Sequence, residues 1–344
     1  ARAIADGGLL ALLACLGLAR LSHEATPALA QLSFSSLLFF ALANLPRKRT
    51  GAWVSSAIAI LGMALSGAPA LAMILGVGGA IVMALDTGKP IALRARSVDV
   101  AWVLLICLAT AALVSALGLW RWRLAYSHIF EIKSMTRLLL WFTWPAWPLA
   151  IWTLWRWRFQ LQHLTANPHL SLPLWFVGVA IGTTWLSGLS DRALLLSLPA
   201  MATLAAFALP TLRRSVSAFV DWFTLVFFSV GALIIWVVWS SMQTGMPAQP
   251  AVNVARLAPG FTHVFSGVAF AFALLASLVW ASLVKWRAGR HRAAIWKSMA
   301  LPAGGAILCW LLVMTLWLPL LNFARSYEPL VLKVRDLIGT PQCV

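Results

Sequence analysis

The chain has 344 residues, of which 62% are hydrophobic and 10% are charged, so it is far more apolar than a soluble domain of this length. Its formal net charge of +17 would suit a nucleic-acid-binding protein, but the basic residues form small clusters between apolar runs instead of one continuous surface. Composition and charge therefore argue against a nucleic-acid partner and predict a protein embedded in a membrane.

Apolar runs separated by charged or turn residues predict eleven membrane-spanning helices and an all-α fold. A helix of about 20 apolar residues is long enough to cross a hydrocarbon core about 30 Å thick. In chain order the predicted spans are residues 3–19, 27–45, 51–66, 70–85, 100–120, 138–155, 172–190, 193–212, 222–242, 263–284 and 298–321. Only Gly67 to Pro69 separate the third span from the fourth, so a helical hairpin and a re-entrant pair both stay open.

The positions of Lys and Arg predict how these spans are oriented, because cytoplasmic loops carry the excess of basic residues. Placing Arg47, Lys48 and Arg49 in the cytoplasm fixes all other loops by alternation. The inner loops then hold 16 basic and four acidic residues, and the outer loops hold 10 basic and five acidic residues. The start of the chain is thus expected in the cytoplasm. Residues 1–324 form the predicted helix bundle, and residues 325–344 begin a segment on the opposite side.

The tryptophan-rich sequence "WFTWPAWPLAIWTLWRWR" runs from Trp141 to Arg158, and all but its last three residues lie in the sixth predicted span. Tryptophan is enriched where a membrane meets water, so these rings are expected to form an interfacial belt. Pro145 and Pro148 each remove a backbone donor and should kink or break the helix. Cysteines and histidines show no metal-binding spacing anywhere in the sequence, so no metal or other cofactor is identified.

Outer polar residues are the candidates for a functional site. Arg192 lies in a very short outer connection, where a guanidinium suits bidentate binding of a phosphate, but a local ion pair with Asp191 is an equal alternative. His23 and Glu24, at the end of the first span, are weaker candidates for a substrate contact, and an interfacial helix end explains them as well.

The outer loop 121–137 carries the densest set of polar residues on that side. Its apolar positions fit one side of a short helix lying in the membrane interface. Four basic residues could bind an anionic lipid headgroup, although a solvated helix without a ligand explains them too. They are Arg121, Arg123, Lys133 and Arg137.

Several short sequences, in order, resemble bacterial family 39 glycosyltransferases, which belong to the C-type membrane superfamily. They include "HEATPALAQL", "LGMALSGAP", "WFTWPAWPLAIWTLWRWR", "SDRALLLSLPAMATLAAFALPTLRRS" and "ARSYEPL". Within this family, the chain is similar to lipid A aminoarabinose transferases and to protein mannosyltransferases. Nearly the whole chain takes part in the resemblance, and the order of the sequences carries more weight than any one of them.

The resemblance implies a multi-pass protein of the bacterial inner membrane that transfers a sugar, with inversion, from a polyprenyl-phosphate donor to a periplasmic acceptor. The eleven spans would correspond to helices 3–13 of a 13-helix bundle with a periplasmic carboxyl-terminal end. Arg192 matches the arginine before the family's "LLPALP"-like segment, so it is expected to contact the lipid phosphate. Membrane lipids and the polyprenyl-phosphate carrier are the implied partners.

The family's first outer loop carries an acidic motif of the "DE-R-Y" kind, and no such motif occurs in this sequence. The catalytic residues are therefore unassigned, and we expect the sequence to be part of a longer glycosyltransferase. An alternative is a non-catalytic relative with a structural or lipid-binding role beside other membrane subunits in a larger complex.

Overall fold

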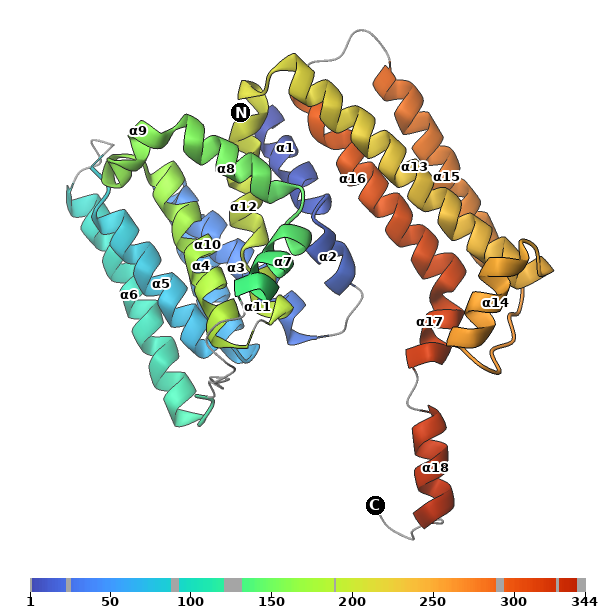
Figure 1. Ribbon diagram of the computed structural model, residues 1–344. Coiled ribbons are helices and arrows are strands. Elements are labelled where there is room, and N and C mark those ends of the chain that lie inside the picture. Colours follow the sequence, from blue (N-terminus) through green and yellow to red (C-terminus); the bar gives the residue numbers. More distant parts are fainter. Residues whose placement is uncertain are drawn as a thin grey trace. The chain divides into compact units, whose positions relative to one another are not determined.

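The computed structural model describes residues 2–22, 26–87, 93–120, 132–188, 190–288, 294–325 and 328–338. Every regular element within these ranges is a helix, so the all-α prediction is confirmed (Figure 1). The chain forms two compact units. Unit 1 comprises Ala1–Val220 and Arg292–Ala303, and unit 2 comprises Asp221–His291 and Gly304–Val344.

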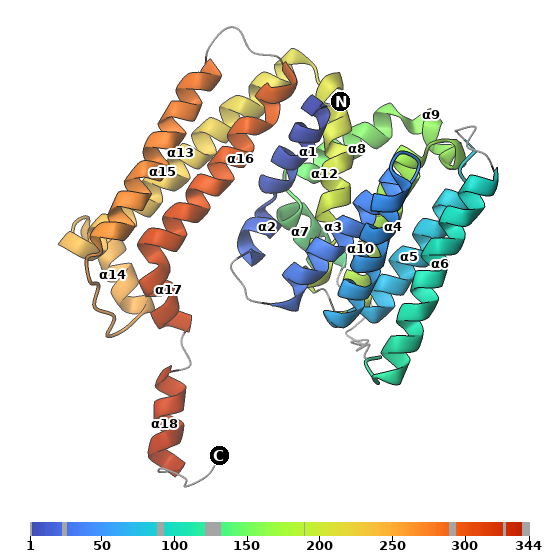
Figure 2. The ribbon, with the colours of Figure 1, turned by 180° about the vertical axis from the view of Figure 1, so that it is seen from behind.

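Unit 1 is built from twelve described α-helices of 4 to 24 residues, several of which pack against three or more others. Its helices are α1 (Arg2–Leu13), α2 (Leu16–Leu21), α3 (Pro27–Asn44), α4 (Arg49–Leu65), α5 (Pro69–Ala84), α6 (Leu93–Ala116), α7 (Ile132–Phe142), α8 (Ala146–Arg156), α9 (Arg158–Leu161), α10 (Pro168–Leu186), α11 (Asp191–Leu195) and α12 (Leu198–Ala208). The most extensive contacts join α3 to α4, α8 to α12, α5 to α6 and α1 to α12 (Figures 1 and 2). Three of these helices begin at a proline, which lacks an N–H that the first helical turn would leave unpaired.

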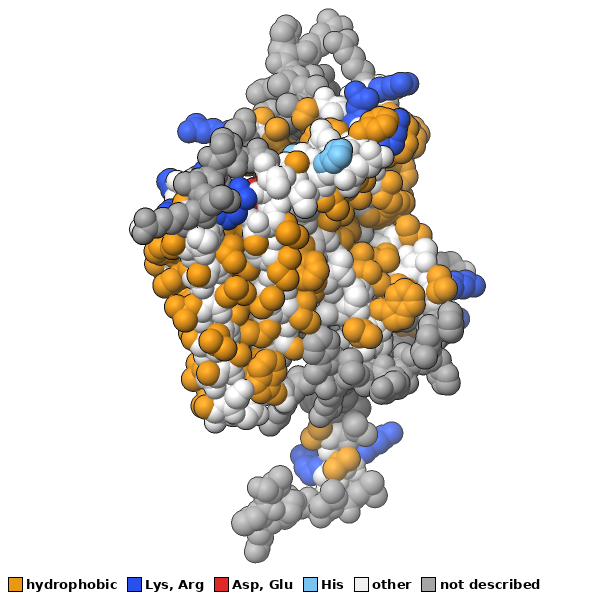
Figure 3. All heavy atoms as spheres, turned by 90° about the vertical axis from the view of Figure 1, so that its left-hand side faces the viewer, with side chains coloured by type: hydrophobic (Ala, Val, Ile, Leu, Met, Phe, Trp, Pro, Cys, Tyr) orange, Lys and Arg blue, Asp and Glu red, His pale blue; other side chains and the backbone are white. Residues whose placement is uncertain are grey.

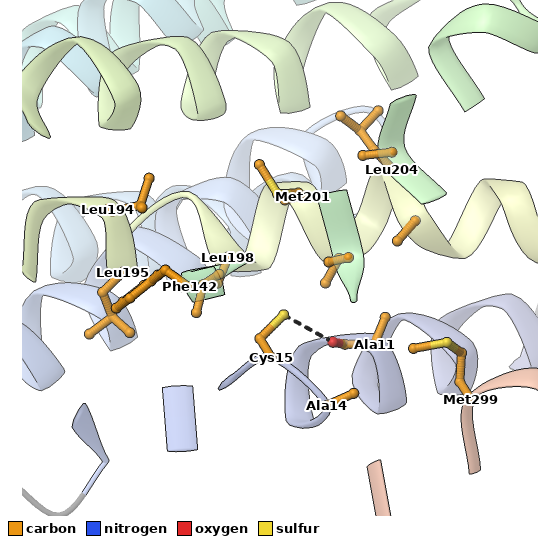
Figure 4. Close-up of a cluster of buried hydrophobic side chains, with 14 of the residues drawn as sticks. Ala11, Ala14, Cys15, Phe142, Leu194, Leu195, Leu198, Met201, Leu204 and Met299 are labelled. Atoms are coloured by element: carbon orange, nitrogen blue, oxygen red, sulfur yellow. Dashed lines mark hydrogen bonds between the residues drawn. The ribbon is translucent and has the colours of Figure 1, made fainter. Parts of the chain in front are cut away.

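The core of unit 1 brings together helices that are far apart in the sequence. In Figure 4, Ala11 and Ala14 of α1 lie near Met299 of α16 (Ala294–Leu312). Phe142 of α7 lies between Leu195 and Leu198. A second cluster of buried residues joins α3, α4, α5 and α6 with α10. Small residues allow this close packing, since a Cβ atom on Gly17 would overlap the ring of Phe142.

Unit 2 consists of long helices joined by tryptophan hydrogen bonds. Its elements are most of α13 (Arg214–Thr244), α14 (Ala248–Leu257), α15 (Gly267–Ala288), the later part of α16, the π-helix Val313–Trp317, α17 (Leu318–Arg325) and α18 (Glu328–Ile338). The Trp236 indole N–H donates to Ser277 Oγ at 3.0 Å, and the Trp280 N–H donates to Ser229 Oγ at 3.1 Å. These bonds satisfy indole donors that an apolar bundle would otherwise leave unpaired.

Six helices of the described chain are long and apolar enough to cross a membrane. They cover Pro27–Asn44, Ala95–Ala116, Pro168–Leu186, Ser215–Thr244, Gly267–Arg287 and Met299–Ala324. Figure 3 shows one face of the molecule on which hydrophobic side chains cover the middle and several basic side chains lie along the upper edge. This composition is that of a helical membrane protein.

The predicted count of eleven spans is not confirmed, because five of them are not single helices of this length. The first span is broken at Cys15 into α1 and α2, and the eighth at Leu196 and Ser197 into α11 and α12. The sixth is broken before α8, whose N-cap is Pro145, so the predicted effect of this proline is confirmed. The third and fourth correspond to α4 and α5, which form a helical hairpin around Gly67 at φ +94°.

Candidate anion-binding site

Helix α11 is a single short turn that presents Arg192 outward while it anchors itself in the core. Leu194 and Leu195 are both fully buried, and Arg192 is exposed. The Ser197 hydroxyl donates to the Leu194 carbonyl at 2.7 Å, which satisfies a polar group at the buried break before α12. The helix packs against α2, α3, α7 and α10.

Helix α2 brings a second arginine to this place. Its Leu16 N–H donates to the Trp144 carbonyl at 3.1 Å, and Gly17 lies against the ring of Phe142, so α2 is fixed to the corner between α7 and α8. At its far end Arg20 forms an ion pair with Asp191, with 3.6 Å between Nη1 and Oδ2. The Arg20 side chain remains 67% exposed and that of Asp191 28%, so water screens this pair considerably.

Helix α7 adds two more cations. It packs against both α2 and α11, buries Met135 and Phe142, and leaves Lys133 and Arg137 exposed. This division fits the amphipathic helix expected in the outer loop. We call Arg20, Lys133, Arg137 and Arg192 the basic cluster. Because Asp191 is the one carboxylate among the described side chains of α2, α7 and α11, the three helices carry an excess of positive charge that favours an anion.

The structure thus groups the helices of three of the residues predicted from the sequence: Lys133, Arg137 and Arg192. His23, Glu24, Arg121 and Arg123 lie outside the described residues. The sequence did not single out Arg20, although its place at the start of an outer loop was a signal for it. The carboxylate of Asp191, proposed as a local partner of Arg192, forms its ion pair with Arg20 of another helix.

Two other arginines pair with aspartates and form structural contacts, one with the buried Asp99 and one with the partly buried Asp221. Arg49 Nε lies 2.9 Å from Asp99 Oδ1, which also accepts the Trp53 indole N–H at 3.0 Å. In unit 2, Arg287 binds both carboxylate oxygens of Asp221, with 3.2 Å between Nε and Oδ1. These carboxylates neutralise the guanidinium groups, so neither site offers the net positive charge of the basic cluster.

The described part of the chain contains no group of three or more His, Cys, Asp or Glu side chains that could hold a metal ion. Comparison with known protein families, curated proteins and solved structures finds no match to this chain. Its function is therefore argued from the basic cluster and from the resemblance in its sequence.

Proposed function

We propose that the chain is the membrane-embedded part of a glycosyltransferase that moves a sugar from a polyprenyl-phosphate donor to a periplasmic acceptor. The basic cluster binds the phosphate of the lipid carrier. The observation that carries this assignment is the packing of α2, α7 and α11, three separate segments that together carry four basic side chains and one carboxylate, Asp191, which pairs with Arg20.

This chemistry needs positive charge at the phosphate. When the bond between the sugar and the phosphate oxygen breaks, the leaving lipid phosphate gains negative charge. Arginine guanidinium groups bind phosphate oxygens through paired N–H donors and stabilise that charge as it develops. The proton of the acceptor passes to a carboxylate, and the described residues assign no side chain to this role.

An orientation with eleven spans in a bacterial inner membrane completes the proposal. Contacts within each unit support it, because they join loops predicted on the same side. Arg20 and Asp191 are both predicted outside. Arg49 and Asp99 in unit 1, and Asp221 and Arg287 in unit 2, are predicted inside.

The first experiment measures binding of a polyprenyl phosphate and of the uncharged polyprenol to the purified protein in lipid nanodiscs. Arg192→Ala should weaken binding of the phosphate about tenfold, because a hydrogen bond to a charged group is lost, and should leave binding of the alcohol unchanged. Arg137→Ala should act in the same direction. Arg47→Ala is the matched control, since Arg47 is an exposed arginine of unit 1 on the predicted inner side. If the unaltered protein bound the phosphate and the alcohol with equal affinity, the basic cluster would not be a phosphate-binding site.

One observation favours a second function, a lipid-binding subunit without catalysis. Asp191, the carboxylate described within the cluster, is ion-paired with Arg20 and is poorly placed to accept a proton. Such a subunit would bind the polyprenyl phosphate beside other membrane proteins and transfer nothing. Transfer of a radiolabelled sugar from the lipid to an acceptor by the purified protein separates the two functions, because only the glycosyltransferase releases the labelled product.

A further inference from the structure

The connection between α13 and α15 lies outside the candidate membrane-spanning helices, because the helix that corresponds to the tenth predicted span begins at Gly267 and not at residue 263. It runs from residue 245 to residue 266 and contains α14, which has no buried residue. Large apolar side chains of this segment are strongly exposed, among them Leu257 at 76% and Val264 at 78%. Few buried contacts hold this connection, so its position against unit 2 depends on a small number of side-chain interactions.

His263 provides one attachment of this segment to the rest of unit 2, beside the ring contacts of Phe261 and Phe265. Its Nδ1 lies 2.5 Å from the side-chain nitrogen of Gln243 at the end of α13. Its ring also packs edge-on against Trp239 of α13, with 6.4 Å between centroids. A further hydrogen bond joins it to the backbone of Leu316 in the π-helix. One imidazole thus links the connection to two membrane-spanning helices.

Aromatic rings surround this imidazole. Phe261 packs edge-on against His263 at 5.9 Å between centroids and also contacts Phe323 of α17 at 5.4 Å. Burial among these groups disfavours the charged imidazolium and lowers the pKa of His263 below its usual value. A neutral imidazole accepts one hydrogen bond and donates another, whereas the protonated ring can only donate.

Charged groups on the neighbouring elements do not offset this penalty. Arg256 of α14 carries the same sign as an imidazolium. Asp221 of α13 and the Lys285 and Arg287 of α15 lie about 20 residues along their helices from this end, which is roughly 30 Å. Protonation would therefore place a positive charge in an aromatic setting without a described carboxylate nearby.

We propose that His263 is a pH-sensitive latch, which holds the connection between α13 and α15 against unit 2 when neutral and releases it when protonated. The direction follows from the environment of the ring. Because burial of the ring outweighs its backbone hydrogen bonds to Leu316 and Val264, the folded state favours the neutral form, and the stability this gives is fully present above the usual histidine pKa. It is lost as the pH falls below that value. Release would free the exposed apolar side chains of the connection to enter the membrane interface.

Hydrogen exchange of the backbone amides in residues 258–266 tests the latch in the purified protein in nanodiscs. Exchange corrected for its intrinsic pH dependence should rise about fivefold between about pH 8 and about pH 5, as expected for the loss of a single hydrogen bond. His263→Gln should abolish this pH dependence. His163→Gln should retain it, since His163 is an exposed histidine of unit 1 and serves as the matched control.

A second variant keeps the test decisive if His263→Gln disturbs folding. Gln243→Glu places beside the imidazole a carboxylate that accepts a hydrogen bond from the protonated ring, so the connection should stay attached at low pH and the rise in exchange should be suppressed. Unchanged protection across the pH range in the unaltered protein would overturn the latch. A rise in exchange as large in Gln243→Glu as in the unaltered protein would also overturn it, because the contact between His263 and residue 243 would then not control release.

Discussion

At the scale of single residues, the position of Arg20 depends on a glycine. Gly17 lets α2 lie directly against the ring of Phe142, and the same helix ends in the arginine that pairs with Asp191. The sequence shows Gly17 only as one small residue in an apolar run. Its role comes from a contact with a residue about 125 positions later, which local pattern cannot reveal.

Gly17→Ala should therefore destabilise the protein and weaken phosphate binding together. The added methyl group overlaps the Phe142 ring, and such overpacking costs about 1–3 kcal/mol. Thermal unfolding in detergent and the nanodisc binding assay measure the two effects. Gly178→Ala is the control, because a Cβ atom at this exposed position of α10 meets no other atom. Equal melting temperatures for the two variants would contradict the close packing of α2.

At the scale of helices, sequence patterns predicted where most elements lie and some of their breaks. Pro145 removes a backbone donor, so the break before α8 could be predicted. The break at Cys15 could not, since no proline or glycine marks it. There the freed N–H of Leu16 donates to the carbonyl of Trp144, a tertiary contact that satisfies the interrupted backbone.

The exposed fraction of a side chain does not show whether it faces lipid or water. A charged substitution does, because its cost depends on how deep in the membrane the residue lies. Leu108 lies in the middle of α6 and is 69% exposed, whereas Leu257 ends α14 and is 76% exposed. Leu108→Arg should reduce membrane insertion strongly, because an arginine at the centre of a spanning helix costs about 3 kcal/mol. Leu257→Arg should insert normally. Quantifying each variant in the membrane fraction compares them, and equal yields would argue against α6 as a spanning helix.

At the scale of the whole molecule, the alternation of charged loops predicts which loops lie in the cytoplasm and which lie outside. This prediction needs no knowledge of which helices are in contact. It also placed Arg192, Lys133 and Arg137 on one common side. Which helices then pack together could not be predicted, because α2, α7 and α11 meet through apolar surfaces that resemble those of every other helix. The sequence thus predicts on which side of the membrane the candidate site lies, and this stays a prediction, whereas it could not predict how the site is assembled or the part of Arg20.

Sidedness can be measured by labelling introduced cysteines with a membrane-impermeant maleimide in intact cells. Ser22→Cys should be labelled directly, because Ser22 is exposed at the end of α2 on the predicted outer side. Lys48→Cys should be labelled only after the membrane is permeabilised. Both variants are made with Cys343→Ser to remove a native thiol outside the predicted spans. Labelling of Lys48→Cys in intact cells would reverse the proposed orientation.

The core of unit 1 also sets an order of events during synthesis. Ala11 and Ala14 share their buried cluster with Met299 and Ala303, which are translated about 290 residues later. At ordinary rates of elongation this interval lasts on the order of tens of seconds. During that time α1 lacks its final neighbour, and other molecules must cover the surface that α16 later occupies. The core of unit 1 can therefore be completed only after α16 has been synthesised, and α1 stays incompletely packed until then.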